Sequence, residues 1–263
     1  MTTALPQIDD ALLEQAVSSA GQFLSGNDLE FFRRVWQTDQ EIYRRRLSGI
    51  GFCGMEAVLD AGCGMGQWTW SLAKLNDSVH AVDYSQARVQ MVAAVHSDLQ
   101  CDNVDVSRQN IENLAFESES FNAIFCYSVL PITDYRKTLT EFSRVLRRGG
   151  RLYLCSNGFG WHLFKFITGH NRSKHYSPRI SSAVAAALTM QHKLTGRFQP
   201  GAGRELITPS GTIARHLQQV GFTDITIGHE GGINVQSTEE LPRLLRSSYM
   251  GLECVYEILA TRS

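Results

Sequence analysis

The sequence predicts an α/β fold built on a doubly wound, mostly parallel sheet. Short apolar runs bounded by turn residues alternate with longer helical patterns through the middle of the chain, which is typical of βαβ units. The runs at 121–127 and 151–156 are nearly unbroken hydrophobic stretches, as expected of strands covered on both faces. The other strands are predicted at 57–61, 79–82, 104–108, 223–228 and 254–262.

The clearest helix is predicted between two of these strands, over 133–150. Leu139 and Phe142 share one face at helical spacing, and Thr133 precedes them as a candidate N-cap. Basic residues followed by Gly149 and Gly150 mark the end. The pattern therefore predicts a helix that packs one apolar face on the sheet.

Four segments follow from the organisation of the chain. Residues 1–50 read as an N-terminal helical cover, with Leu29, Phe32, Val35 and Trp36 on one face, and 51–156 read as the α/β core. Residues 157–207 interrupt the alternation and are too long for a structureless loop, so we expect an inserted helical cap. Residues 208–263 complete the core, with a helix bracketed by Pro209 and Gly221 before the last strands.

Composition favours a cytoplasmic protein without a metal site. The 263 residues are 43% hydrophobic, with neither the basic head and apolar core of a signal peptide nor an apolar run of membrane-spanning length. The six cysteines form no CxxC pair and mostly lie in apolar stretches, as buried free thiols do. No transmembrane segment is expected, although peripheral membrane contact stays open.

The charge is nearly neutral overall but unevenly distributed. A formal net charge of −1 argues against nonspecific binding of nucleic acid. Between Asn157 and Ile207, however, seven bases stand against a single acid, Glu205, so this segment carries +6 and the remainder −7. The predicted cap is therefore the basic part of the chain.

A glycine-rich turn follows the first predicted strand. Gly62, Gly64 and Gly66 lie within five residues after Asp60, in a D-x-G-x-G-x-G pattern. A glycine-rich turn between the first strand and the first helix brings backbone N–H groups close to a ligand at the carboxyl edge of the sheet. The dinucleotide fingerprint G-x-G-x-x-G would need its third glycine at position 67, which is Gln67. The spacing therefore favours a nucleoside cofactor other than NAD.

In this pattern the sequence resembles the class I S-adenosylmethionine (SAM) dependent methyltransferases. The resemblance is close over about 55–156: Asp83 ends the second strand 17 residues after Gly66, and "QNIENLAFESESFNAIFCYSVL" and "RVLRRGGRLYL" follow in the family's order. It implies a seven-stranded Rossmann-like methyltransferase fold, with SAM as cofactor. Two positions depart from the family, which usually has Asp where Asn110 and Asn122 stand.

The resemblance also assigns roles to individual residues. Asp83 would accept hydrogen bonds from both ribose hydroxyls, Asn110, Ile111 and Glu112 would flank the adenine, and Tyr127 and Ser128 would face the methionine part. SAM has no phosphate, which agrees with the absence of a P-loop lysine. Asp60 and the loop N–H groups suit the ammonium and carboxylate of SAM. The predicted cofactor set is Tyr43, Arg46, Asp60, Gly62, Cys63, Gly64, Gly66, Asp83, Tyr84, Asn110, Ile111, Glu112, Tyr127 and Ser128.

Candidates for acceptor binding and proton transfer lie in the predicted cap. The candidates for the base that methyl transfer to oxygen would need are His162, His170, His175 and Tyr176. Aromatic residues interleave with bases in "GFGWHLFKFITGHNRSKHY" (158–176), which suggests a lid over an apolar acceptor with an anionic group. The candidate acceptor contacts are Trp161, Phe164, Arg172 and Lys174.

The predicted function is SAM-dependent methyl transfer to a small-molecule acceptor, with oxygen favoured over nitrogen or carbon. Three alternatives stay open. The aromatic and basic segment 158–176 also suits a membrane surface, with a lipid- or quinone-like acceptor. A noncatalytic SAM-binding protein would keep the glycine turn, and an NAD-dependent oxidoreductase would share the fold but not the glycine spacing.

Overall fold

The computed structural model describes residues 10–172, 176–198 and 203–263, and within them one seven-stranded sheet dominates. Its strands are β1 (Val58–Ala61), β2 (Val79–Asp83), β3 (Val104–Arg108), β4 (Phe121–Tyr127), β5 (Leu146–Asn157), β6 (Phe222–His229) and β9 (Val255–Arg262). Their order is β3-β2-β1-β4-β5-β9-β6, parallel from β3 to β5, with β9 antiparallel to both of its neighbours. The predicted fold class is confirmed, and every predicted strand is present.

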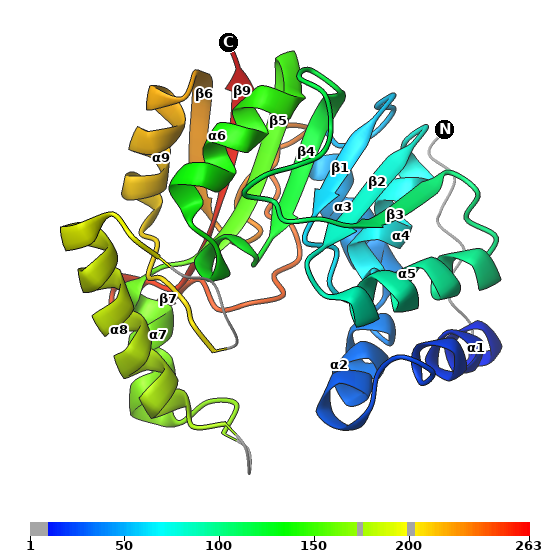
Figure 1. The fold of residues 1–263 in the computed structure, drawn as a ribbon, viewed down its shortest axis with the longest axis horizontal. Coiled ribbons are helices and arrows are strands. Elements are labelled where there is room, and N and C mark those ends of the chain that lie inside the picture. Colours follow the sequence, from blue (N-terminus) through cyan, green and yellow to red (C-terminus); the bar gives the residue numbers. More distant parts are fainter. Residues whose placement is uncertain (1–9, 173–175, 199–202) are drawn as a thin grey trace.

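Helices cover both faces of the sheet. They are α1 (Asp10–Ala20), α2 (Gly26–Trp36), α3 (Gln40–Gly49), α4 (Gln67–Leu75), α5 (Gln86–Asp98), η1 (Leu130–Ile132), α6 (Tyr135–Val145), α7 (Phe159–Thr168), α8 (Pro178–Thr195) and α9 (Ser210–Gln219). One hydrophobic cluster joins α1 to α5 with one face of the sheet, and a second joins α6 and α9 with the other. Figure 1 shows α6 and α9 in front of the sheet.

Alternate residues of the central strands supply the two clusters. Phe125 and Tyr153 point into the cluster of α1 to α5, whereas Ile124 and Leu154 point into that of α6 and α9. All four are buried, because helices cover both faces of these strands. This explains why β4 and β5 read as unbroken apolar runs.

The helix predicted at 133–150 is shorter than expected at both ends. Its N-cap is Asp134, which accepts the Arg136 N–H at 3.2 Å, while the Thr133 hydroxyl bonds back to Leu130. The helix ends at Val145, because Leu146 already pairs with Phe121 as the first residue of β5. Four residues, 147–150, then bulge out opposite Asn122 before the ladder resumes.

The segment after β5 forms a helical hairpin at the carboxyl edge of the sheet. Helices α7 and α8 pack on each other and lie beyond the lower edge in Figure 1. A short two-stranded ladder, β7 (Ser248–Tyr249) with β8 (Leu252–Glu253), packs beside α7. No helix in the described ranges is long and apolar enough to cross a membrane.

Candidate functional site

The glycine turn between β1 and α4 combines two packed glycines with one that faces open space. All three have positive φ, at 87°, 55° and 79° for Gly62, Gly64 and Gly66. A Cβ at Gly62 would lie 2.3 Å from the Val129 side chain, and one at Gly66 would lie 3.0 Å from His96. At Gly64 it would meet only the carbonyl oxygen of Gly62, at 3.8 Å. The turn is therefore held on both sides and leaves room for a ligand at Gly64.

Asp83 holds this turn from the end of β2. Its Oδ2 accepts the Gly64 N–H at 3.1 Å, and its Oδ1 accepts the Ser85 N–H at 2.8 Å. The side chain is largely buried, and each oxygen keeps a second acceptor site. The acid that the resemblance assigns to the ribose thus lies against the open glycine, which fits a nucleoside at this position.

Asp60 lies under the turn, within β1. It is buried, and its Oδ2 accepts the Thr69 hydroxyl at 2.6 Å. Burial raises the pKa of Asp60 to about 7, against the opposing effect of the Thr69 hydrogen bond and with a contribution from the Asp83 charge. The carboxyl therefore changes charge near neutral pH. Cys63, in the turn, is buried too, and burial raises the pKa of its thiol well above the usual value, so it stays neutral.

The loop after β3 uses its polar atoms largely for its own structure. Asn110 Oδ1 accepts the Glu112 N–H at 3.0 Å, and Glu112 Oε1 accepts the Asp134 N–H at 2.8 Å. Ile111 is buried in the cluster of α6 and α9. Tyr84 is 70% exposed, so its ring is available to a ligand beside this loop. These residues can shape an adenine site chiefly through apolar surface and ring contacts.

The end of β4 adds an exposed serine and a fixed tyrosine. Ser128 is exposed with φ of 61°, an uncommon conformation for a residue other than glycine, and its N–H bonds to the Cys155 carbonyl at 2.9 Å. Tyr127 donates to Glu230 at 3.0 Å, and its ring lies 4.9 Å from that of Trp68. Both residues therefore border the same edge as the glycine turn.

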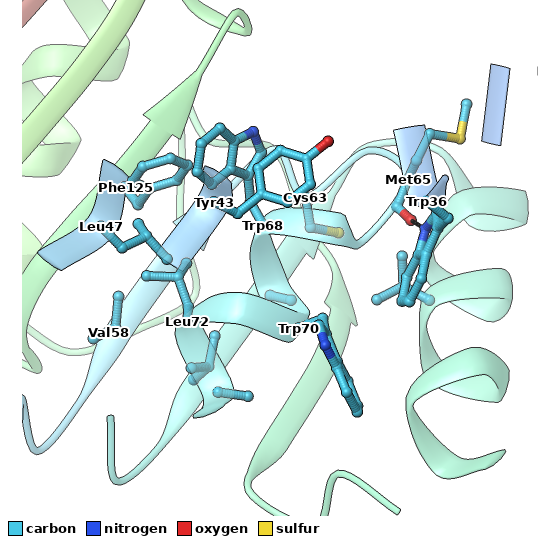
Figure 2. Packing of buried hydrophobic residues seen from close by; sticks show 14 of the residues in the cluster. Trp36, Tyr43, Leu47, Val58, Cys63, Met65, Trp68, Trp70, Leu72 and Phe125 are labelled. Atoms are coloured by element: carbon cyan, nitrogen blue, oxygen red, sulfur yellow. Dashed lines mark hydrogen bonds between the residues drawn. The ribbon is translucent and has the colours of Figure 1, made fainter. Parts of the chain in front are cut away.

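Tyr43 and Arg46 lie on α3 with their polar groups engaged inside the protein. Tyr43 packs on Trp68 with ring centroids 4.6 Å apart (Figure 2). Its hydroxyl donates to the Val35 carbonyl at 3.0 Å. The Arg46 guanidinium pairs with Glu230 and with Glu257. The Tyr43 hydroxyl is already bound and the whole Arg46 side chain is buried, so neither residue presents a polar group to a ligand carboxylate, and we leave both out of the proposed cofactor contacts.

His162 is a buried histidine of the predicted cap. It lies on α7, only 2% exposed, and neither ring nitrogen has a hydrogen-bond partner among the described residues. Glu205 Oε2 lies 3.9 Å from its Nε2 and 3.2 Å from the ammonium of Lys165, which is 3.5 Å from the Tyr176 hydroxyl. Burial, aided by the Lys165 charge, lowers the pKa of His162 to about 3. The imidazole is therefore neutral at pH 7.

Backbone contacts connect this histidine cluster with the glycine turn. Leu206, next to Glu205, donates its N–H to the Pro131 carbonyl at 2.7 Å. Pro131 follows β4 in the short helix η1, two residues after the Val129 that contacts Gly62. The cluster and the turn thus lie at the same edge of the sheet, on either side of the segment that follows β4.

The other cap residues divide into an aromatic cluster and exposed charges. Trp161, Phe164 and His170 pack against one another in tilted and edge-on arrangements with ring centroids 4.9–5.9 Å apart, and Phe164 also contacts Tyr249. Arg172 is exposed. Lys174 and His175 lie outside the described residues, and within the described ranges no group of three acidic, histidine or cysteine side chains could hold a metal ion.

Sequence reasoning missed the partners that position these groups. Lys165 and Glu205 flank His162, and Glu230 and Glu257 hold Arg46. A signal existed for Glu205 alone, since it is the single acid in a strongly basic segment. A single acid surrounded by bases in sequence is a natural partner for one of them.

The sequence matches the methyltransferase-domain family over residues 58–150, from the start of β1 to the turn within β5. A curated relative, the ubiquinone biosynthesis O-methyltransferase of Xanthomonas oryzae pv. oryzae, is 36% identical over 101 residues. That match covers 38% of this chain and 42% of the relative, so it spans less than half of either protein.

Solved structures with this fold cover more of the chain at lower identity. The geranyl diphosphate C-methyltransferase of Streptomyces coelicolor A3(2), in a complex with S-adenosyl-L-homocysteine, is 17% identical, covers 89% of this chain and 82% of its own, and has a TM-score of 0.60. The [4+2]-cyclase SpnF is 14% identical, with coverage of 95% and 93% and a TM-score of 0.58. Because the second is named as a cyclase, the fold alone does not determine the reaction.

Proposed function

Because residues 58–150 form a methyltransferase domain of the class I SAM-dependent family, we propose that this chain transfers a methyl group from SAM to a small-molecule acceptor. The observation that carries the proposal is the open position at Gly64, whose N–H is bound to Asp83 beside it. SAM supplies a methyl group that is already activated on its sulfonium sulfur. The protein therefore has to bind and orient the donor, align the acceptor and, for an oxygen acceptor, remove a proton.

The described residues divide these tasks among neighbouring loops. Asp83 would hold the ribose hydroxyls. The turn of Gly62, Cys63, Gly64 and Gly66 would pack its backbone against the ligand without donating to the carboxylate of SAM, because the N–H groups of these residues are bound to Val82, Asp83 and Cys63. Asp60 would attract the ammonium. The residues proposed to flank the adenine are Tyr84, Asn110, Ile111 and Glu112, and those proposed to face the methionine part are Tyr127 and Ser128.

Calorimetric titration with SAM, S-adenosylhomocysteine and NAD tests the cofactor. We expect binding of both adenosyl ligands and not of NAD. If only NAD binds, the proposal is wrong and an NAD-dependent oxidoreductase becomes the better description. If SAM binds but radiolabelled methyl groups reach no member of a panel of catechols, phenols and amines, a noncatalytic SAM-binding protein becomes the better description.

The affinity for SAM is expected to rise with pH through neutrality. With a pKa of about 7, Asp60 is mostly protonated at pH 6 and mostly ionised at pH 8, and only the carboxylate attracts the ammonium of SAM. We expect Kd to fall about tenfold between these pH values, in proportion to the ionised fraction. Calorimetric titration of Asp60→Asn with SAM over the same pH range should show a Kd that lacks this tenfold change with pH. If the Kd of the variant changes with pH as that of the wild type does, the role of Asp60 is contradicted.

For an oxygen acceptor, we propose His162 as the proton acceptor. Its imidazole is neutral at pH 7, and its buried Nδ1 has no partner among the described residues, so an acceptor hydroxyl can reach it only if the side chains around it move aside. Glu205, 3.9 Å from Nε2, would stabilise the imidazolium that forms when Nδ1 takes the hydroxyl proton. Lys165 holds Glu205 in place from the other side.

Replacement of His162 by glutamine is expected to lower kcat about tenfold, with the Kd for SAM unchanged. This loss of kcat is smaller than is usual when a general base is removed, because a side chain with a pKa of about 3 is a weak base. His170→Gln is the comparison variant, since His170 is the exposed candidate base of the same segment. Equal effects of the two substitutions on kcat would remove His162 from the reaction.

A lipid- or quinone-like acceptor at a membrane surface is the second candidate. Ile180, Met190 and Leu194 of α8 are 67%, 58% and 78% exposed, and the bases Arg179 and Lys193 lie on the same helix. The name of the Xanthomonas relative also suits a quinone-like acceptor. Methyl transfer to isoprenoid-substituted phenols, assayed with and without anionic vesicles, separates the two candidates: vesicles should stimulate turnover only for the membrane-surface enzyme.

A further inference from the structure

A cleft of about 720 Å³ lies at the edge of the sheet opposite the glycine turn. The bulge of residues 147–150 and the following Arg151 form one wall, and Ser48 and Gly51 at the end of α3 form another. Asn122 contributes from the start of β4. The volume is within the range of pockets that take small molecules.

The charged residues that line this cleft are all arginines. Arg147, Arg148 and Arg151 are present, and no aspartate or glutamate belongs to the lining. Arg147 pairs with Glu56 at 2.6 Å, and Arg148 lies 3.9 Å from Glu119. Glu119 is shared with a further arginine, Arg262, at 3.2 Å. Two carboxylates outside the lining thus pair with three guanidinium groups, and Arg151 adds a fourth without a carboxylate, so the balance of charge is positive.

Arg151 is the guanidinium that this arrangement leaves without an anion. Its one hydrogen bond within the described protein donates to the Gly51 carbonyl at 3.2 Å, and it forms no ion pair with a described carboxylate. A Cβ at Gly51 would lie 1.9 Å from this guanidinium, so glycine is what lets it approach. A guanidinium has five donors in a planar fork, so most of the donors of Arg151 have no acceptor among the described residues.

We propose that this cleft binds a small polyanionic metabolite, with an oxyanion of the phosphate or carboxylate type on Arg151. Paired N–H donors in a fork match such oxyanions. Arg147 and Arg148 add positive charge at the wall, while Gln236, Cys53 and Ser48 offer polar groups to the remainder of the ligand. The concave shape suits a small molecule, and the near-neutral net charge of the whole chain does not suit a nucleic acid.

This site is separate from the proposed cofactor site. Asn122 stands at the amino end of β4, whereas Tyr127 and Ser128 stand at its carboxyl end, and a strand of this length spans about 20 Å. The ligand should therefore bind without displacing SAM. The inference does not depend on the proposed methyl transfer.

Calorimetric titration with pyrophosphate, and in a second arm with citrate, tests the proposal and separates phosphate from carboxylate ligands. We expect saturable binding of at least one anion, weakened about tenfold by Arg151→Gln because a charge-assisted hydrogen bond is lost. Arg151→Lys keeps the charge but not the planar fork of donors, so its affinity for the anion should lie between those of the wild type and Arg151→Gln. Arg45→Gln removes the same charge from an exposed position of α3 outside the cleft and should leave binding unchanged.

Retained SAM binding checks that the Arg151 variants are folded. The proposal is overturned if neither anion binds saturably, if Arg45→Gln weakens binding as much as Arg151→Gln does, or if pyrophosphate and SAM displace each other. These outcomes are independent of whether any acceptor is methylated.

Discussion

Replacement of Asp83 by alanine is expected to weaken SAM binding on the order of 100-fold. Two ribose hydroxyls would lose a charged acceptor, and hydrogen bonds to charged groups contribute about 1.5–3 kcal/mol each. The Gly64 and Ser85 N–H groups would lose their acceptors as well, so the turn itself would be less well held. Calorimetric titration of the variant with SAM and with S-adenosylhomocysteine measures the loss.

Two further variants separate the ligand contact from the support of the turn. Asp83→Asn keeps one side-chain oxygen as an acceptor but removes the charge, so its SAM affinity should lie between those of the wild type and Asp83→Ala. Asp105→Ala removes a carboxylate that is 84% exposed on the neighbouring strand and should bind SAM normally. If Asp105→Ala weakens binding as strongly as Asp83→Ala does, the ribose role of Asp83 is wrong.

Local patterns were sufficient to predict the sheet. A central strand such as β4 must be apolar on both faces, and the residues that meet this demand are adjacent in sequence. The predicted helix at 133–150 was wrong at its end, since Leu146 has helical spacing with Leu139 and Phe142 but pairs with Phe121. Phe121 lies 25 positions before Leu146, and helical periodicity cannot reveal that a residue pairs with a strand so far away in the sequence.

The glycine turn of the candidate site was predictable, because its shape rests on backbone conformation. Gly62, Gly64 and Gly66 all have positive φ, and their spacing in sequence was enough to find the turn. The partners of buried charges were not predictable in this way. Arg46 is 184 residues from Glu230 and 211 from Glu257, and no pattern in the sequence connects such positions. Arg46 looked available for a ligand because its partners lie at the other end of the chain.

Arg46 lies at the centre of a buried ionic network. Its guanidinium binds Glu230, and it donates to Glu257 at 2.9 Å and to the Tyr153 hydroxyl at 2.8 Å. The three charged side chains are at most 2% exposed. Tyr127 also donates to Glu230, at 3.0 Å. The network thus ties the N-terminal cover to the last strands and to the end of β4.

Replacement of Arg46 by methionine is expected to reduce the free energy of unfolding by about 3–5 kcal/mol at pH 8, because two carboxylates stay buried without a cation. One of them can avoid this cost by taking up a proton. A carboxyl that binds its proton more tightly in the folded than in the unfolded chain stabilises the fold at low pH and loses that contribution as the pH rises. The deficit relative to the wild type should therefore be smaller at pH 5 than at pH 8, as measured by urea unfolding.

The matched control is Arg44→Met on the same helix. Arg44 pairs with Glu41 at a partly exposed position, where loss of an ion pair should cost less than about 1 kcal/mol at either pH. Adding Glu230→Gln and Glu257→Gln to Arg46→Met removes the buried charges altogether and should recover part of the stability, since neutral amides carry a smaller desolvation cost. A deficit in Arg46→Met that is independent of pH, or that the triple variant does not reduce, would mean that lost packing and not buried charge destabilises the fold.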